Sequence, residues 1–168
     1  MKKIFLTLTL VFAAMVATNA QNVAFISTEK VLESLKSYVD AQQELNALAE
    51  KYQASIQQDV DELDAIYREY QQNKAYYSQQ QQTSRENYII DREKAINEKQ
   101  ETYFGEKGVM AIRSESLLKP IKDRVQAAID AVAARHGYVI ILDTSVMPGV
   151  VYKNDKYDLT NEVIEYLK

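Results

Sequence analysis

Few side chains in this sequence have the types and the spacing that catalysis or metal binding requires. The chain has one His and no Cys, so a Ser-His-Asp set would have to use His136. A pair of acid–base carboxylates would have to come from Asp143, Asp155 and Asp158. These aspartates stand in turn-like stretches, where Asp accepts local hydrogen bonds, and His136 fits the last turn of a helix that Gly137 ends. We therefore predict that the protein is not an enzyme and holds no metal or other cofactor.

A long antiparallel helical hairpin is predicted for residues 28–135. The run up to Phe104 has no Gly or Pro and is rich in residues that helices tolerate well. The sequence Thr83-Ser84-Arg85-Glu86 has the Thr-x-x-Glu pattern of a capping box, which starts a helix. The reversal is therefore placed near residues 79–84. The two arms, of equal length, are expected to span Thr28–Gln79 and Ser84–Arg135.

Apolar side chains repeat every seven residues in the first arm, and more weakly in the second. Such a repeat is the pattern of a coiled-coil seam. The companion positions of the second arm are mostly charged or polar, so the arms should pair loosely and bend at Gly105, Gly108 and Pro120. The first arm has one column of Val31, Tyr38, Leu45, Tyr52, Asp59, Ile66 and Asn73 and another of Leu35, Gln42, Ala49, Ile56, Leu63, Tyr70 and Tyr77; the second arm has Ile89, Ile96, Tyr103, Met110 and Leu117, then a denser stripe of Ile121, Val125, Ala128, Ile129 and Val132.

Residues 21–27 and 136–168 are predicted to form a small β body from which the hairpin projects, which makes the fold class α+β. Strands are expected at 22–26, at 138–142 and at 150–152, and the second of these is apolar throughout and should be buried on both faces. A base of this size buries too little apolar surface to be stable alone, which favours oligomerisation. The side chains expected to join the copies are Val23, Phe25, Val139, Ile141 and Val151. A final helix should begin at a cap formed by Asp158 or Thr160 and bury Leu159, Val163, Ile164 and Leu167.

The first 20 residues are predicted to be a secretory signal peptide. A basic start at Lys2 and Lys3 precedes an apolar run, and small residues lead up to a cleavage site after Ala20. The alternative, a membrane anchor, is disfavoured because the run is too short to span a bilayer comfortably. Export points to the bacterial periplasm. The mature chain would carry 18 basic and 24 acidic residues, a formal charge of −6, which disfavours nucleic acid as a partner.

Tyrosine is frequent, with 12 in the chain against four Phe and no Trp. A Tyr ring offers apolar contact while its hydroxyl group tolerates water, so a cluster of them could contact varied, partly apolar partners. The alternative is packing within the seam, to which Tyr70 and Tyr77 belong by their spacing. The candidate contact residues in the outer half of the hairpin are Tyr67, Tyr70, Tyr76, Tyr77, Tyr88 and Tyr103.

The order of these segments resembles the Skp (OmpH-like) family of periplasmic chaperones. The resemblance rests on the strand Val23–Ile26, on Lys30-Val31-Leu32 at the start of a long helix, on Tyr138–Asp143, on Val151-Tyr152 and on Asp158-Leu159-Thr160. It implies a homotrimer in which strands of three chains form the β body. The helical hairpins then project like tentacles around a cavity and hold unfolded outer-membrane β-barrel proteins without ATP.

One departure from the family is the charge. Well-known members are basic with positive tentacle tips, whereas residues 71–90 here contain only Lys74 and Arg85 against Glu86. We therefore carry over no lipopolysaccharide site, expect at most peripheral membrane contact, and expect client binding to depend less on salt than a basic tip would require. The alternative function is a structural coiled coil of the cell envelope, which the thin seam of the second arm disfavours.

Overall fold

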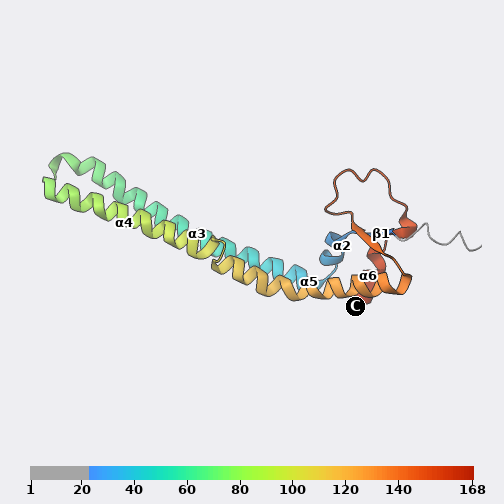
Figure 1. Ribbon diagram of the computed structural model, residues 1–168. Coiled ribbons are helices and arrows are strands. Elements are labelled where there is room, and N and C mark those ends of the chain that lie inside the picture. The colour runs from blue at the N-terminus through green and yellow to red at the C-terminus, as the bar shows by residue number, and fades with distance from the viewer. Residues whose placement is uncertain (1–22) are drawn as a thin grey trace, which may run out of the picture. The chain divides into compact units, whose positions relative to one another are not determined.

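The computed structural model describes residues 23–168, which Figure 1 shows coloured by residue number. The predicted signal peptide lies outside the described residues. The chain divides into two compact units, and we describe each by itself. The body unit contains 23–36 and 121–168, and the hairpin unit is Ser37–Pro120. This division groups 28–36 and 121–135, which the sequence analysis placed in the hairpin, with the strands.

The body unit contains a parallel pair of short strands, β1 (Val23–Ile26) and β2 (Ile140–Asp143). Val23 pairs with Ile140, and Ile26 pairs with Asp143. Because alternate side chains point to opposite faces, one face of the sheet carries Ala24, Ile26 and Ile141, and the other, which we call the outer face, carries Val23, Phe25, Ile140 and Leu142. Two of the three predicted strands are therefore present.

The core of the body unit covers only one face of this sheet. Ala24 and Ile26 pack against the second half of α5 (Val109–His136) and against α6 (Thr160–Leu167). The predicted apolar stripe of α5 and the predicted apolar face of α6 are both confirmed. The buried members are Val31, Val125, Ala128, Val132, Leu159 and Val163, with Leu32, Leu35, Ile129, Tyr138, Ile141, Ile164 and Leu167 packed around them.

Two predictions for the body are wrong for a single chain. The stretch 138–142 is not buried on both faces, because Val139 and Ile140 are exposed. No strand forms at 150–152, and Val151 is 99% exposed. A strand needs a neighbour that accepts and donates its backbone hydrogen bonds, and the described chain offers these residues none.

The hairpin unit pairs α3 (Lys36–Asn73) with α4 (Gln79–Phe104) and with the first part of α5, as Figure 1 shows. Every position of the predicted first-arm columns is buried or half-buried, which confirms the seven-residue repeat. The first arm is not one helix from Thr28, however. A short helix α2 (Thr28–Glu33), whose N-cap is Ser27, ends at Ser34, and α3 begins after Leu35.

The reversal comes earlier than predicted, at residues 74–78. A 3-10 turn η1 (Lys74–Tyr76) ends α3, and Ser78 then caps α4. The Ser78 hydroxyl group accepts from the Gln81 amide, and the Gln81 side chain accepts from the Ser78 amide at 2.8 Å, so the real capping box is Ser-x-x-Gln. Thr83, the predicted cap, lies inside the helix and donates to the Gln79 carbonyl at 3.1 Å.

The return arm is interrupted at Gly105–Gly108, as predicted, whereas α5 continues through Pro120. Both glycines are required by close backbone approach. A Cβ atom on Gly105 would lie 2.5 Å from the Glu101 carbonyl oxygen, and one on Gly108 would lie 2.9 Å from the Thr102 carbonyl oxygen. Within residues 23–168, no helix is long and apolar enough to cross a bilayer.

Candidate functional site

The carboxylates that could have formed an acid–base pair hold the body together. Asp143, at the end of β2, accepts hydrogen bonds from the Thr28 amide at 3.2 Å and from the Thr28 hydroxyl group. It also accepts from the Ser145 amide at 3.0 Å. Burial alone would raise the pKa of Asp143, but the hydrogen bonds from Ser145 and Thr28 outweigh it and hold the pKa below its ordinary value.

Asp158 has a similar structural role in front of α6. It accepts from the Thr160 amide at 3.0 Å and from the ammonium group of Lys153. Burial alone would raise the pKa of Asp158, but the hydrogen bonds from Lys153 and Thr160 outweigh this effect and hold the pKa below its ordinary value. Asp155 is exposed in the 3-10 turn η2 (Asp155–Tyr157). The N-cap position of α6 is Leu159, so the predicted cap at Asp158 or Thr160 is wrong by one residue, although the Asp158 carboxylate does accept from the first amide of the helix.

His136 ends α5 as predicted, and Gly137 follows it with a positive φ of 69°. The His136 Nε2 atom lies 2.8 Å from a carboxylate oxygen of Glu162, and Arg135 reaches the same carboxylate at 3.2 Å. These contacts join the end of α5 to α6. In the part of the chain that the structure describes, no group of three or more His, Asp or Glu residues is arranged to hold a metal ion.

Acid should loosen the body unit through Asp143 and Asp158. Both have a folded-state pKa below the ordinary value of 3.8, so their ionised forms stabilise the fold above that pH, and the contribution is lost as pH falls through the folded values. We expect urea-unfolding midpoints to fall between pH 6 and pH 3. The Asp143→Asn variant should show a shallower fall, while Asp155→Asn should keep the wild-type slope. A wild-type slope in Asp143→Asn would contradict this assignment.

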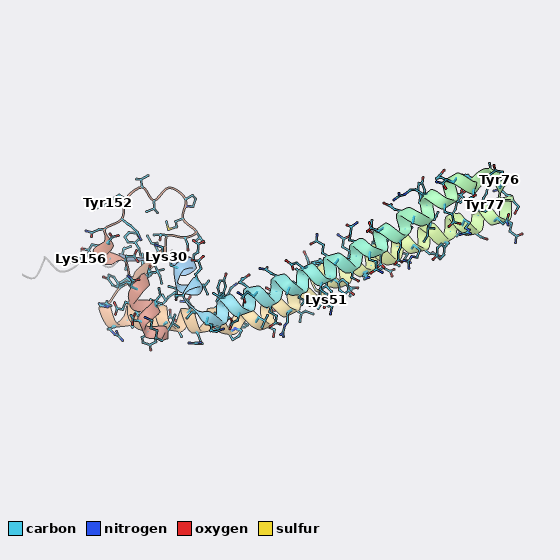
Figure 2. The ribbon with its side chains drawn as sticks, turned by 180° about the vertical axis from the view of Figure 1, so that it is seen from behind. Lys30, Lys51, Tyr76, Tyr77, Tyr152 and Lys156 are labelled. Carbon is cyan, nitrogen blue, oxygen red and sulfur yellow. The ribbon has the colours of Figure 1, made fainter. Side chains whose placement is uncertain are left out.

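The body unit exposes apolar side chains on its sheet and in the loop that follows β2. The core leaves the outer face of the sheet uncovered, and Val23 and Ile140 are exposed there, while Phe25 and Leu142 are half-buried. The loop that follows β2 adds further exposed side chains, including Tyr152, which Figure 2 shows on this loop. The apolar residues exposed between β2 and η2 are Val146, Met147, Val150, Val151 and Tyr152, and Val139 precedes β2. Exposed apolar side chains in such numbers are typical of interaction surfaces.

The predicted assembly residues divide between two surroundings. Val23 and Phe25 lie on the outer face, and Val139 and Val151 are exposed outside the strands. Ile141 instead packs against the core of its own chain. Sequence reasoning missed Ile140, which is 50% exposed on the outer face, because an uninterrupted apolar run does not indicate which alternate residues the core takes.

Half of the candidate tyrosines pack within the hairpin seam. Tyr70 is only 4% exposed, stacks on Tyr77 with ring centroids 6.2 Å apart, and donates to the Glu86 carboxylate. Burial raises the pKa of Tyr70. Tyr103 stacks on Tyr52 at 4.0 Å. For these three candidates the packing alternative describes the observed contacts.

The other three candidate tyrosines are exposed. Tyr76 is 85% exposed at the reversal, and Figure 2 shows it beside Tyr77 at that end of the hairpin. Tyr67 on α3 and Tyr88 on α4 are about half exposed. The structure therefore leaves Tyr67, Tyr76 and Tyr88 available to a partner.

The polar companion positions of the second arm have a defined role that sequence reasoning missed. Lys99 bonds to the Asp59 carboxylate at 2.6 Å and to the Ser55 carbonyl at 3.2 Å. Arg92, seven residues earlier, bonds to Glu62 at 3.2 Å. Asp59, which interrupts the apolar column, thus has a cation opposite it. This pairing could have been predicted from the sequence, because Arg92 and Lys99 are themselves seven residues apart and so repeat with the period of the seam.

The charges at the reversal are also paired within the hairpin. Lys74 bonds to Glu86 at 3.3 Å, and Arg85 lies 3.7 Å from Glu69. The hydrogen bond from Tyr70, followed by that from Lys74, lowers the pKa of Glu86. This end of the hairpin is therefore not a concentration of free positive charge.

Comparison with known proteins gives two matches and one negative result. A family model described as outer membrane protein (OmpH-like) matches residues 22–167. Among solved structures, the chain is similar to an OmpH-like protein from Caulobacter crescentus CB15, named there as a candidate outer membrane chaperone. That likeness has a TM-score of 0.66 at 14% identity and covers 90% of this chain and 86% of the other, so it shows a shared fold alone. The search of curated proteins gives no match.

Proposed function

Because the chain belongs to the outer membrane protein (OmpH-like) family, we propose that it is a chaperone of outer-membrane proteins. It acts as an ATP-independent holdase that encloses unfolded β-barrel proteins and prevents their aggregation. The observation that carries this proposal is the family match over residues 22–167. The solved structure that shares its fold is itself named a candidate chaperone.

The body joins three copies in this proposal. The outer face of the sheet and the apolar loop after β2 are exposed in a single chain, and apolar strand surfaces of this kind are normally paired or covered. Strands from neighbouring copies would cover Val23 and Ile140 and give Val151 the backbone partners it lacks. Residues 23–27 and 136–168 are thus the association domain, and the hairpin is left free to hold clients.

The hairpin holds clients through many weak contacts. Its described surface carries exposed apolar side chains spread over α3, η1, α4 and α5. A dispersed surface suits an unfolded chain with no fixed shape. These residues are Val39, Tyr67, Tyr76, Tyr88, Ile90, Phe104, Val109 and Ile112.

The protein works in the periplasm in this proposal, after cleavage of the signal peptide behind Ala20. Its clients are exported as unfolded chains whose strands cannot yet pair in a membrane, so they need protection from aggregation in water. Their apolar strands are the surfaces to be shielded.

Sedimentation of the mature protein, residues 21–168, tests assembly and holding together. It is run alone and with a urea-unfolded outer-membrane barrel protein diluted into buffer. A trimer, and a soluble complex with one client, are the expected results. A stable oligomer that leaves the client to aggregate would refute the holdase proposal and favour the envelope scaffold.

Removal of the three exposed tyrosine rings should weaken holding. Tyr67, Tyr76 and Tyr88 are changed together to Ser, and we expect client affinity to fall about tenfold, since each ring offers apolar area at an exposed position. The measurement is the concentration of protein that keeps half of the barrel protein soluble, with oligomer mass checked by sedimentation.

Tyr166→Ser is the matched control, because Tyr166 is 52% exposed but lies on α6 in the body unit. It should leave holding unchanged. Equal holding by the triple variant and the wild type would show that the three rings do not contact clients.

A further inference from the structure

The interruption of the return arm opens a shallow apolar hollow on the hairpin unit. Glu101, Thr102, Lys107, Gly108, Val109 and Ile112 line it. Val109 and Ile112 are exposed, and Ile112 is 63% exposed. The hollow exists because Gly105 and Gly108 allow a turn that would not accommodate a Cβ atom at either position.

The interruption does not disturb the seam. Tyr103 and Met110, seven residues apart on either side of it, both remain half-buried. Arg113, beyond it, still reaches Glu44 on α3 with its Nε atom at 2.7 Å. The turn keeps the pairing of the two arms and exposes apolar side chains without improving their packing. A local feature that does not help the fold in this way is often kept for binding.

The hairpin unit that carries the hollow has a net negative charge. Residues 37–120 carry 15 acidic and 10 basic residues, so the hairpin unit accounts for most of the negative charge of the mature chain. Most of its basic residues form ion pairs with carboxylates of the same unit. These residues are Lys74, Arg85, Arg92, Lys94, Lys99 and Arg113.

Many carboxylates of the hairpin unit have no such pair. Within residues 37–120, seven carboxylate groups make neither a hydrogen bond nor an ion pair, whereas two lysines, Lys51 and Lys107, are equally free. Of these carboxylates, Glu101 lines the hollow, and Lys107 is the one cation among its lining residues. The free carboxylates are those of Glu50, Asp64, Asp91, Glu93, Glu101, Glu106 and Glu115.

We propose that this hollow is a client-contact site for an apolar side chain that lies next to a lysine or arginine in an unfolded chain. Val109 and Ile112 bind the apolar side chain, and the net negative charge of the hairpin unit, with Glu101 at the hollow, attracts the cation. This inference rests on the proposed holdase function and adds a substrate class to it, cationic apolar segments. We choose cationic segments because of charge complementarity: the excess of carboxylates on the hairpin unit would repel an acidic segment.

Two labelled, unstructured peptides test the charge preference. Both contain the same Leu and Phe residues separated by Gly and Ser, and one has Lys where the other has Glu. Fluorescence anisotropy with the assembled mature protein at low salt should show the Lys peptide binding about tenfold more tightly. Added salt should reduce the difference in affinity between the two peptides, since it screens exposed charges. Equal binding of the two peptides would overturn the proposed preference.

Ile112→Ser tests the place of binding, with Ile90→Ser as its matched control. Ile90 is 57% exposed on α4 and does not line the hollow. Ile112→Ser should lower affinity for the Lys peptide about fivefold, the order expected for one apolar side chain, and Ile90→Ser should leave it unchanged. Equal losses in the two variants would overturn the hollow as the site.

The peptide result is separable from the proposed function. If neither peptide binds while an unfolded barrel protein is still kept soluble, the holdase proposal stands and the hollow is refuted. If the barrel protein aggregates in the presence of the chain but the Lys peptide binds in an Ile112-dependent way, the hollow binds cationic apolar segments and the holdase proposal falls.

Discussion

An Ile140→Asp substitution is expected to abolish the assembly of the protein. Ile140 is half exposed on the outer face of the sheet, opposite Val23 in the strand pairing. In the proposed trimer this face is covered by neighbouring copies, so each copy would bury a carboxylate without a partner. That costs several kcal/mol per group, and three such groups would lie in one small body. We expect monomers at micromolar concentration in sedimentation, with client holding lost as well.

Tyr166→Asp is the control for this substitution. Its side chain is 52% exposed, a value close to that of Ile140, but it lies on α6 and not on the outer face. It should leave the oligomer mass unchanged. Because Ile140 is outside the core of its own chain, helical content by circular dichroism distinguishes loss of assembly from loss of folding in the hairpin. An intact trimer in Ile140→Asp would place the contact between copies elsewhere.

The elements of the body were predictable because their patterns are strong. The α5 stripe that includes Val125 and Val132 has helical spacing, and both side chains are buried. The strands at 23–26 and 140–143 are short, β-prone and bounded by polar residues. The strand at 150–152 is different, since its apolar residues have the right types but their partners are not in the same chain. Periodicity indicates what a segment could form, and pairing decides whether it does.

The reversal of the hairpin was misplaced because two capping sequences compete within a few residues. Ser78-x-x-Gln81 and Thr83-x-x-Glu86 both fit the local pattern. Glu86 is engaged with Tyr70 and Lys74 across the hairpin, so it does not serve as a cap residue. The register between two helices decided the outcome, and register depends on contacts between residues distant in the sequence.

The tyrosines show the same limit. The frequency of tyrosine predicted an aromatic surface, but the seven-residue repeat assigned three of the six candidate residues, Tyr70, Tyr77 and Tyr103, to seam columns. Those three pack inside, and Tyr67, Tyr76 and Tyr88, which stand off the columns, are exposed. The repeat therefore contained the correct division, although the sequence did not indicate whether the exposed rings bind anything.

An Asp143→Ala substitution is expected to destabilise the body unit by about 2–4 kcal/mol, since it removes a charged acceptor of several hydrogen bonds. Asp143 ties the end of β2 to the start of α2, where the Thr28 amide donates to it, and it shapes the following turn through Ser145. Loss of the carboxylate leaves the half-buried Thr28 amide without this partner. In a body this small, a loss of that size approaches the whole stability of a marginal domain.

Asp155→Ala is the matched control for this prediction. Asp155 was an equal candidate in the sequence, but it is exposed in η2, and its removal should change stability by less than about 0.5 kcal/mol. Urea unfolding at pH 7, followed by circular dichroism and by oligomer mass, measures both variants. If Asp143→Ala unfolds like the wild type, the carboxylate does not stabilise the body, and an active role for it in binding or chemistry would have to be reconsidered. If the two variants differ as expected, the aspartates are accounted for by the fold, and the search for function belongs on the apolar surfaces.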